Sequence, residues 1–402
     1  LADVIGRRTL YRVGVGGFAA LSLVCAVAPS VPVLLVARAV QGAFAATMIP
    51  VSLAILLADT PPERRGNSVA LWSATGAFAA AVGPSVGGVL VHVFGWRSLF
   101  VINVPTGLAL AAAAGILPRT ATARTRLPDA LGTVLLALGI GLAALGLSQG
   151  SVWGWSDART IASLAGGVAG TVAAIQRSWR MPVPAIETGL WKHRTFALAN
   201  GASLLYGASL YAWMLLGVLV LTQLWHYSEL QAGLAMTPGA IAASVAAVAV
   251  GRRATPRTAV AAGAALMAAS GLFIAATLPT HGDFLTYWLP IGLVLGAGMG
   301  MVTTGTSTAA ALSVPPQSFA AGTGLNQTAR QVGGALGVAT LATIVRSGAA
   351  GQAATFTHVY VFVSLAALGA GLVGLGLVLR PATAAADAGE PVSAQVSAAP
   401  AR

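Results

Sequence analysis

Charged residues are scarce in this sequence: Asp, Glu, Lys and Arg together make up 8% of its 402 residues. Soluble domains usually carry about 25% charged residues, so this composition excludes an ordinary soluble protein. Acidic residues are the scarcest, with ten in the chain against 22 Lys and Arg. All ten lie in predicted loops, near the chain ends or at the edges of apolar segments. We therefore expect no carboxylate deep within a membrane.

Several kinds of reactive group are also missing. The single cysteine, Cys25, excludes an intrachain disulfide. The five histidines lack the spacing of metal ligands, and the sequence contains no Ser-His-Asp set, phosphate-binding loop or pair of carboxylates. We therefore predict that the protein is not an enzyme and that it binds neither a metal nor a cofactor.

Apolar sequence, in contrast, is abundant, since hydrophobic residues make up 56% of the chain. Twelve apolar segments of about 20 residues are each long enough to cross roughly 30 Å of hydrocarbon as a helix. Their approximate limits are residues 11–28, 33–57, 68–93, 99–117, 130–149, 159–176, 196–222, 231–250, 258–278, 285–312, 321–345 and 356–379. Hydrocarbon cannot hydrogen-bond to backbone groups, so these segments must be helical. The sequence predicts an all-α, polytopic protein of the lipid bilayer.

The net charge of +12 would suggest a nucleic-acid partner in a soluble protein. Here the position of the basic residues gives it another meaning. Seventeen lie in connections on one side of the predicted membrane, three (Arg97, Arg159, Arg346) on the other, and two (Arg38, Arg330) inside spans. The positive-inside rule makes the rich side cytoplasmic. We therefore predict a cytoplasmic C-terminus in the cytoplasmic membrane and no nucleic-acid partner.

Arg38 lies inside the second predicted span, and Gln41 and Gly42 follow it along the same helical face. A guanidinium at membrane depth costs roughly 2.5 to 3.5 kcal/mol on insertion scales, so it normally faces a bundle interior or a water-filled path. A role in transport is therefore favoured. The alternative is a structural hydrogen bond to backbone carbonyls or to Gln41.

The third predicted span carries a pattern of glycine and proline: Gly76, Gly83, Pro84, Gly87 and Gly88. Proline removes one helical hydrogen bond and clashes with the preceding turn, which predicts a kink at this point. Gly83 and Gly87 are four residues apart, so they leave a flat strip on which a neighbouring helix could approach closely.

Candidate substrate-binding residues lie on two spans. The seventh span and its end carry Asn200, Tyr206, Trp213 and Gln223, and the eleventh carries Asn326, Gln327 and Arg330. Aromatic rings with a few polar groups suit amphiphilic and cationic compounds, through stacking and cation–π contact. Aromatic residues at helical spacing also serve as ordinary packing, and an arginine can extend its head group towards the membrane surface. Both alternatives stay open.

Several motifs, in order, resemble those of the major facilitator superfamily. Asp3, Gly6, Arg7 and Arg8 resemble the loop between the second and third helices of that family, and Arg38, Gln41 and Gly42 resemble its fourth-helix motif. Residues 76–88 resemble the antiporter signature of the fifth helix. Residues 95–107 and 324–334 are similar to the fourteen-helix drug:proton antiporters of the EmrB/QacA type.

The resemblance implies a major facilitator fold in which twelve of fourteen expected helices are present and the first two are missing. It divides the chain into residues 1–118, the remainder of the amino-terminal half; 119–194, a two-helix insert; 195–380, the carboxy-terminal half; and 381–402, a disordered cytoplasmic tail. It further implies that Asp3, Gly6, Arg7 and Arg8 latch the two halves together. Arg38, with Gln41 and Gly42, would assist proton transfer, and the antiporter motif would seal the bundle against ion leak.

The function implied by the resemblance is proton-coupled efflux of hydrophobic or cationic drugs by alternating access. Two alternatives remain, since cavity residues rather than motifs set the substrate. The protein could export a specific metabolite or lipid precursor on the same fold, or it could be an inactive truncated transporter. In the resembled branch a first-helix aspartate is a common proton carrier, and the predicted spans hold no carboxylate. We therefore expect the 402-residue chain alone to be inactive.

Overall fold

A computed structural model describes residues 5–116, 129–347 and 352–379. Within these ranges every regular element is helical. The α-helices are α2 (Arg7–Ala26), α3 (Val31–Ala58), α4 (Arg65–Phe94), α5 (Ser98–Val101), α6 (Asn103–Ala113), α7 (Ala130–Trp153), α8 (Ala158–Arg180), α9 (Arg194–Leu219), α10 (Glu229–Arg253), α11 (Pro256–Thr277), α12 (Leu289–Leu312), α13 (Phe319–Ser347) and α14 (Gln352–Gly374). Five short helical segments accompany them: three 3-10 helices, η1 (Pro62–Arg64), η2 (Thr188–Lys192) and η5 (Pro316–Ser318), and two π-helical segments, η3 (Val220–Leu224) and η4 (Phe284–Trp288).

These helices confirm the predicted all-α fold, and each of the twelve predicted spans coincides with one or two of them. In the described part of the chain, nine helical stretches are long and apolar enough to cross a membrane. Two further helices, α4 and α13, have 30 and 29 residues. The predicted span 99–117 is divided into α5 and α6. Pro105 in α6 has no N–H to donate to Val101, which explains a break at this point.

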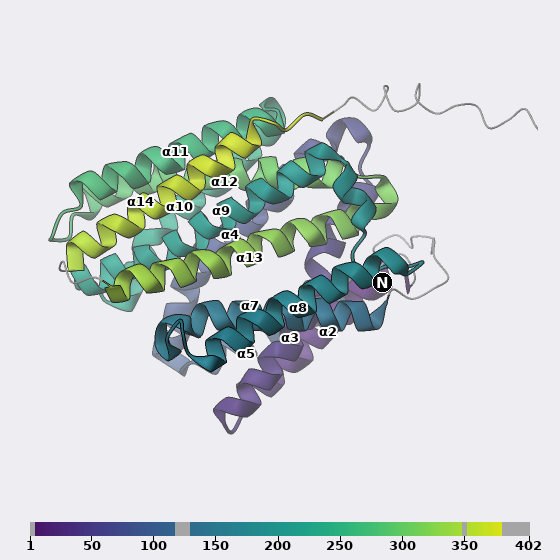
Figure 1. Ribbon diagram of the computed structural model, residues 1–402. Helices are drawn as coiled ribbons and strands as arrows, with labels where there is room; N and C mark the ends of the chain where they lie inside the picture. Colours follow the sequence, from purple (N-terminus) through teal and green to yellow (C-terminus); the bar gives the residue numbers. More distant parts are fainter. Residues whose placement is uncertain (1–4, 117–128, 348–351, 380–402) are drawn as a thin grey trace, which may run out of the picture.

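Figure 1 shows the carboxy-terminal helices α9 to α14 grouped together, with α2 and α3 at the opposite side and α7 and α8 between them. Within the carboxy-terminal group, α9 packs against α13 and α14, and α11 packs against α12 and α14. The main hydrophobic core lies here, with Phe196, Tyr206, Phe356 and Tyr360 among its most deeply buried side chains. The amino-terminal helices α2 to α6 join this group mainly where α4 packs against α10.

Glycines allow neighbouring helices of the carboxy-terminal group to lie in backbone contact. A side chain at Gly333 of α13 would overlap the carbonyl oxygen of Leu204 of α9. A side chain at Gly207 of α9 would overlap the carbonyl oxygen of Arg330. Small residues permit such close approach between helices in a membrane, where packing rather than hydrophobic burial drives association. The close approach of α9 and α13 places the polar side chains of the two helices against each other.

Candidate functional site

The predicted latch loop is described from Gly6 onward, because Asp3 lies outside the described residues. Gly6 precedes α2 with φ of 85°, a conformation that favours glycine. Arg7 donates from Nη1 to the carbonyl oxygen of Ala54 at 3.3 Å and from Nη2 to that of Pro316 at 3.0 Å. Arg8 is partly buried beside it. Arg7 thus joins α3 to η5, which links α12 to α13.

Gln41 is fully buried and connects three side chains on α2 and α3. Its Oε1 accepts from Nη1 of Arg38 at 2.7 Å, and its Nε2 donates to Oγ of Ser22 at 2.5 Å. Cys25 Sγ donates to the same Oε1 at 3.9 Å. The Arg38 guanidinium also lies 5.7 Å from the centre of the Phe100 ring. The structure therefore contains the Arg38–Gln41 hydrogen bond that the sequence analysis gave as the structural alternative for Arg38. A role of Arg38 in proton transfer remains a proposal.

Gly42, the third residue of that motif, is exposed on α3, and a side chain built there meets no described atom within 4 Å. The face of α3 that bears Gly42 is therefore open in this structure. The motif consists structurally of one buried amide, Gln41, one exposed guanidinium, Arg38, and one exposed glycine.

The antiporter motif lies on α4, which is assigned as one helix through Pro84. At Gly83, the first glycine of the predicted flat strip, an added Cβ would meet nothing within 4 Å, and the same holds for Gly76 earlier on the helix. Gly87 and Gly88 have only ordinary neighbours, Leu99 at 3.5 Å and Leu230 at 3.7 Å. The close approach of a neighbouring helix along this strip therefore stays a prediction. The kink at Pro84 stays a prediction.

Four of the substrate-site candidates meet between α9, α12 and α13, or close to that interface. Nδ2 of Asn326 donates to Oγ of Ser203 at 2.8 Å, one turn before Arg330 on α13. The hydroxyl of Tyr206 donates to the carbonyl oxygen of Met299 at 3.1 Å and lies 2.7 Å from Oγ1 of Thr303. Arg330 lies against the Tyr206 ring, its Cζ 5.6 Å from the ring centre. Asn200, nearer the N-terminus of α9, is buried and donates to the carbonyl oxygen of Phe196 at 2.8 Å.

The other three candidates lie apart from this cluster. The Trp213 ring is 5% exposed and packs edge-on against Tyr360 of α14, with ring centres 5.0 Å apart. Gln223 lies in η3, at the far end of α9, where it is exposed. Gln327 is partly buried on α13. Packing, the alternative to substrate contact, therefore accounts for Trp213 in this structure.

The hydroxyl groups of α12 were missed by the sequence analysis. Thr303 faces Tyr206, while Ser307 and Thr306 accept hydrogen bonds from Arg330 at 3.0 and 3.5 Å. A signal was available, because residues 303–308 place five hydroxyl side chains in one otherwise apolar span. Pairing them with Arg330 required knowing that α12 and α13 are neighbours.

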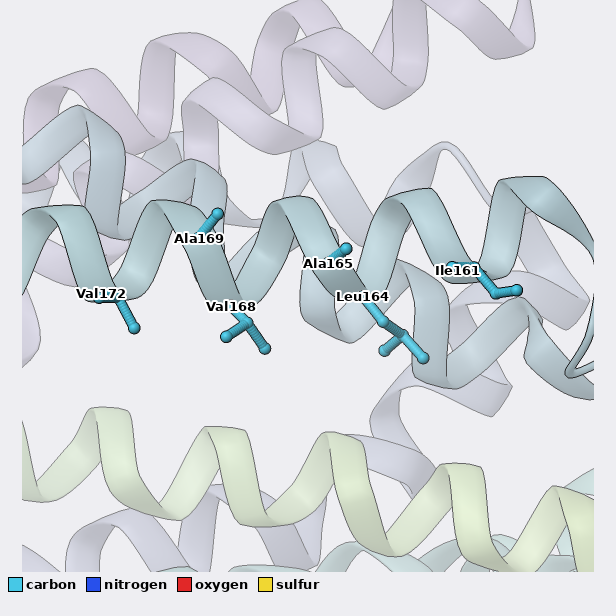
Figure 2. Close-up of a pocket in the computed structure, with 6 residues that line it drawn as sticks. All are labelled: Ile161, Leu164, Ala165, Val168, Ala169 and Val172. Atoms are coloured by element: carbon cyan, nitrogen blue, oxygen red, sulfur yellow. The ribbon is translucent and has the colours of Figure 1, made fainter.

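An apolar pocket of about 640 Å³ lies along α8, lined by Ile161, Leu164, Ala165, Val168, Ala169 and Val172. Figure 2 shows Leu164, Val168 and Val172 pointing into the space beside α8. None of these six lining side chains can form a hydrogen bond, so the lining is entirely apolar.

An ion pair joins the start of α7 to the last turn of α8. Asp129, the residue before α7, accepts a hydrogen bond at 2.6 Å from Nε of Arg177 on α8. This hydrogen bond holds the pKa of the Asp129 carboxyl below its usual value. The pair fixes the ends of the two helices to each other, which pack closely along their length through Gly139 and Gly167.

Taken together, the apolar helices and their close packing define a polytopic helical membrane protein. Comparison with known families places it more narrowly. Residues 1–338 match the Major Facilitator Superfamily, and the chain belongs to that family. This confirms the resemblance that the sequence motifs indicated.

Curated relatives add detail. The chain is 33% identical over 351 residues to a multidrug resistance protein B homolog of Mycobacterium tuberculosis, covering 86% of this chain and 65% of that protein. It is 34% identical over 377 residues to the cephamycin export protein CmcT of Amycolatopsis lactamdurans, covering 90% and 76%. The crystal structure of the human organic anion transporter MFSD10 (TETRAN) aligns with a TM-score of 0.63 at 18% identity, covering 92% of this chain and 78% of that one. That likeness shows the fold alone.

Proposed function

We propose that this protein exports small hydrophobic or cationic drugs across the cytoplasmic membrane in exchange for protons, by alternating access. The names of its relatives, which include multidrug resistance and antibiotic export proteins, support drugs as substrates. Because the chain spans 65% of the length of several of these relatives, this activity is proposed for the whole transporter that contains it.

The bridge made by Arg7 is the observation that carries the proposal. It joins α3 of the amino-terminal helices to η5 of the carboxy-terminal helices. In an alternating-access transporter, contacts of this kind hold one end of the cavity closed and must break when it opens. We propose that residues 1–118 and 195–380 are the two moving halves, that 119–194 is an insert between them, and that Arg7 belongs to the latch.

Proton exchange requires a group that gains and loses a proton between the two states, and arginine cannot serve. In the described part of the chain the acidic residues lie at helix ends or in connections. We propose that Arg38 and Gln41 assist proton movement at the amino-terminal helices, with the carrier itself elsewhere in the protein.

Transport by the purified whole transporter in lipid vesicles tests this function. A hydrophobic fluorescent dye is enclosed with the protein, and a pH gradient is imposed across the vesicle membrane. We expect dye movement that follows the gradient, stops with a protonophore and is absent from vesicles without protein. Dye movement that ignores the gradient would contradict proton exchange, and the absence of any movement would contradict drug export.

A further inference from the structure

Arg330 places a positive charge in the interior of α13, away from both ends of the helix. It lies eleven residues after Phe319, where α13 begins, which corresponds to about 17 Å along the helix. Its residue surface is only 7% exposed, so the side chain does not reach the aqueous phase. The structure thus excludes the alternative in which Arg330 extends its head group to the membrane surface.

The groups that contact the Arg330 guanidinium in the described ranges are neutral. Nη2 donates to the hydroxyls of Ser307 and Thr306, and the Tyr206 ring lies beside Cζ. Nε is buried and has no hydrogen-bond partner among the described residues. Buried charged groups are normally paired and fully hydrogen-bonded, because desolvation costs several kcal/mol per ion. Arg330 therefore lacks one expected hydrogen bond among the described residues, the one from Nε.

Neighbouring helices supply no counter-charge. The five helices that pack most closely against α13 are α3, α7, α9, α12 and α14. None of them contains an aspartate or glutamate between its first and last residue. In the described ranges, the acids instead lie at helix ends and in connections, far from the midpoint of α13. The positive charge is thus unbalanced within its surroundings.

We propose that Arg330 binds the carboxylate of an acidic amphiphile that the protein exports. The inference rests on the proposed export function, and it changes the proposed substrate class from hydrophobic or cationic compounds to acidic amphiphiles. Nε and one Nη of a guanidinium form a fork that matches the two oxygens of a carboxylate, and Nε is the atom left without a partner among the described residues. Ser307 can rotate its hydroxyl hydrogen towards the same anion, whereas the Thr306 hydroxyl donates to the carbonyl oxygen of Val302 at 2.8 Å.

Tyr206 gives the guanidinium a fixed orientation. The close approach of α9 and α13 at Gly207 sets the Tyr206 ring against Arg330, and the Tyr206 hydroxyl is held by α12 through Met299. The same contact covers the Tyr206 ring, which the sequence suggested as a surface for cationic drugs. The Trp213 ring is likewise covered, by Tyr360. The two rings are therefore occupied by protein contacts, while Arg330 has a donor directed at no described group.

A matched pair of ligands tests this proposal on the whole protein in detergent. The probes are a xanthene dye with a free carboxylate and the methyl ester of the same dye, with binding followed by fluorescence polarisation. We expect the wild-type protein to bind the acid at least about ten-fold more tightly than the ester, since losing one partner of a buried charge pair weakens binding strongly. Equal affinity for the two dyes would overturn the proposal, and this comparison needs no variant.

Variants then assign the preference to one side chain. We expect Arg330→Gln to reduce acid binding to the level of the ester while ester binding changes less than about two-fold, and Arg330→Lys to keep part of the preference. Arg346→Gln, at the exposed end of the same helix, is the control and should keep the wild-type preference. An unchanged preference in folded Arg330→Gln protein would refute the assignment.

Two further measurements distinguish a carboxylate site from an inorganic-anion site, and binding from transport. Thermal unfolding of the wild-type protein is measured with added chloride, and with gluconate as the control. If chloride stabilises the protein while the acid and ester dyes bind equally, the site binds an inorganic anion and the proposal is refuted. Transport of both dyes is measured separately in vesicles. Selective acid binding without transport would contradict the export function alone, whereas transport of the ester and acid at equal KM would contradict the anion site alone.

Discussion

Gly298 of α12 offers a test of how tightly α11 and α12 are packed. A Cβ built at Gly298 would lie 2.6 Å from the carbonyl oxygen of Gly263 and 2.9 Å from Cγ of Met267. Ordinary contact begins at 3.4 Å, so Gly298→Ala must move the α11 backbone by several tenths of an ångström. Overpacking of this kind costs about 1 to 3 kcal/mol.

Gly292 on the same helix is the matched control, because a Cβ there meets nothing within 4 Å. The gain in helix propensity from Gly to Ala, up to about 1 kcal/mol, applies to both variants and cancels in their comparison. We therefore expect Gly298→Ala to be less stable than Gly292→Ala by roughly 1 to 3 kcal/mol. The displacement would also shift Ser307 and Met299, which hold Arg330 and Tyr206.

Denaturant unfolding of both purified variants in detergent, followed by circular dichroism, measures this difference. Acid-dye binding to the same samples reports whether the Arg330 surroundings have moved. Equal stabilities of the two alanine variants would refute the backbone contact between α11 and α12 and the reasoning built on it.

Three other substitutions test the remaining contacts. Gln41→Leu should lower the unfolding free energy by about 1 to 3 kcal/mol because Arg38 and Ser22 lose their hydrogen bonds to the Gln41 amide. Gln176→Leu, at an exposed position, is the control. Equal losses of stability for the two variants in denaturant unfolding would contradict a structural role for the buried Gln41 amide. Arg7→Ala removes the hydrogen bonds to Ala54 and Pro316, each of about 1 kcal/mol, so a thiol introduced at Ser318 should react roughly five- to thirty-fold faster. Arg12→Ala should leave the rate unchanged, and no acceleration in Arg7→Ala would argue against the latch. Arg177 lowers the pKa of Asp129, so the pair contributes stability above the ordinary pKa of 3.8, and this stability is lost as pH falls through the lower pKa of the folded protein. Thermal unfolding between about pH 5 and pH 2 should therefore show a smaller acid-induced loss of stability in Asp129→Asn than in the wild type. Identical pH profiles for the two proteins would exclude the linkage.

The sequence alone determined the fold class, because a helix is the only way an apolar segment of this length can satisfy its backbone in a membrane. The same argument located the helices, and their ends differ from the prediction by a few residues in most cases, as in Ala130–Trp153 against the predicted 130–149. Arg38 and Gln41 could be paired from sequence too, since residues three apart lie on one helical face.

Contacts between helices far apart in the chain were decided by tertiary structure only. Ser307 and Arg330 lie on different helices, and no periodicity relates them. Arg7 and Pro316 are more distant still, 309 residues apart in the chain. The strip of Gly83 and Gly87 illustrates the reverse case, where a pattern permits close packing that the structure does not use at its first glycine. A glycine specifies only that a neighbour can approach, while the arrangement of all the helices decides whether one does.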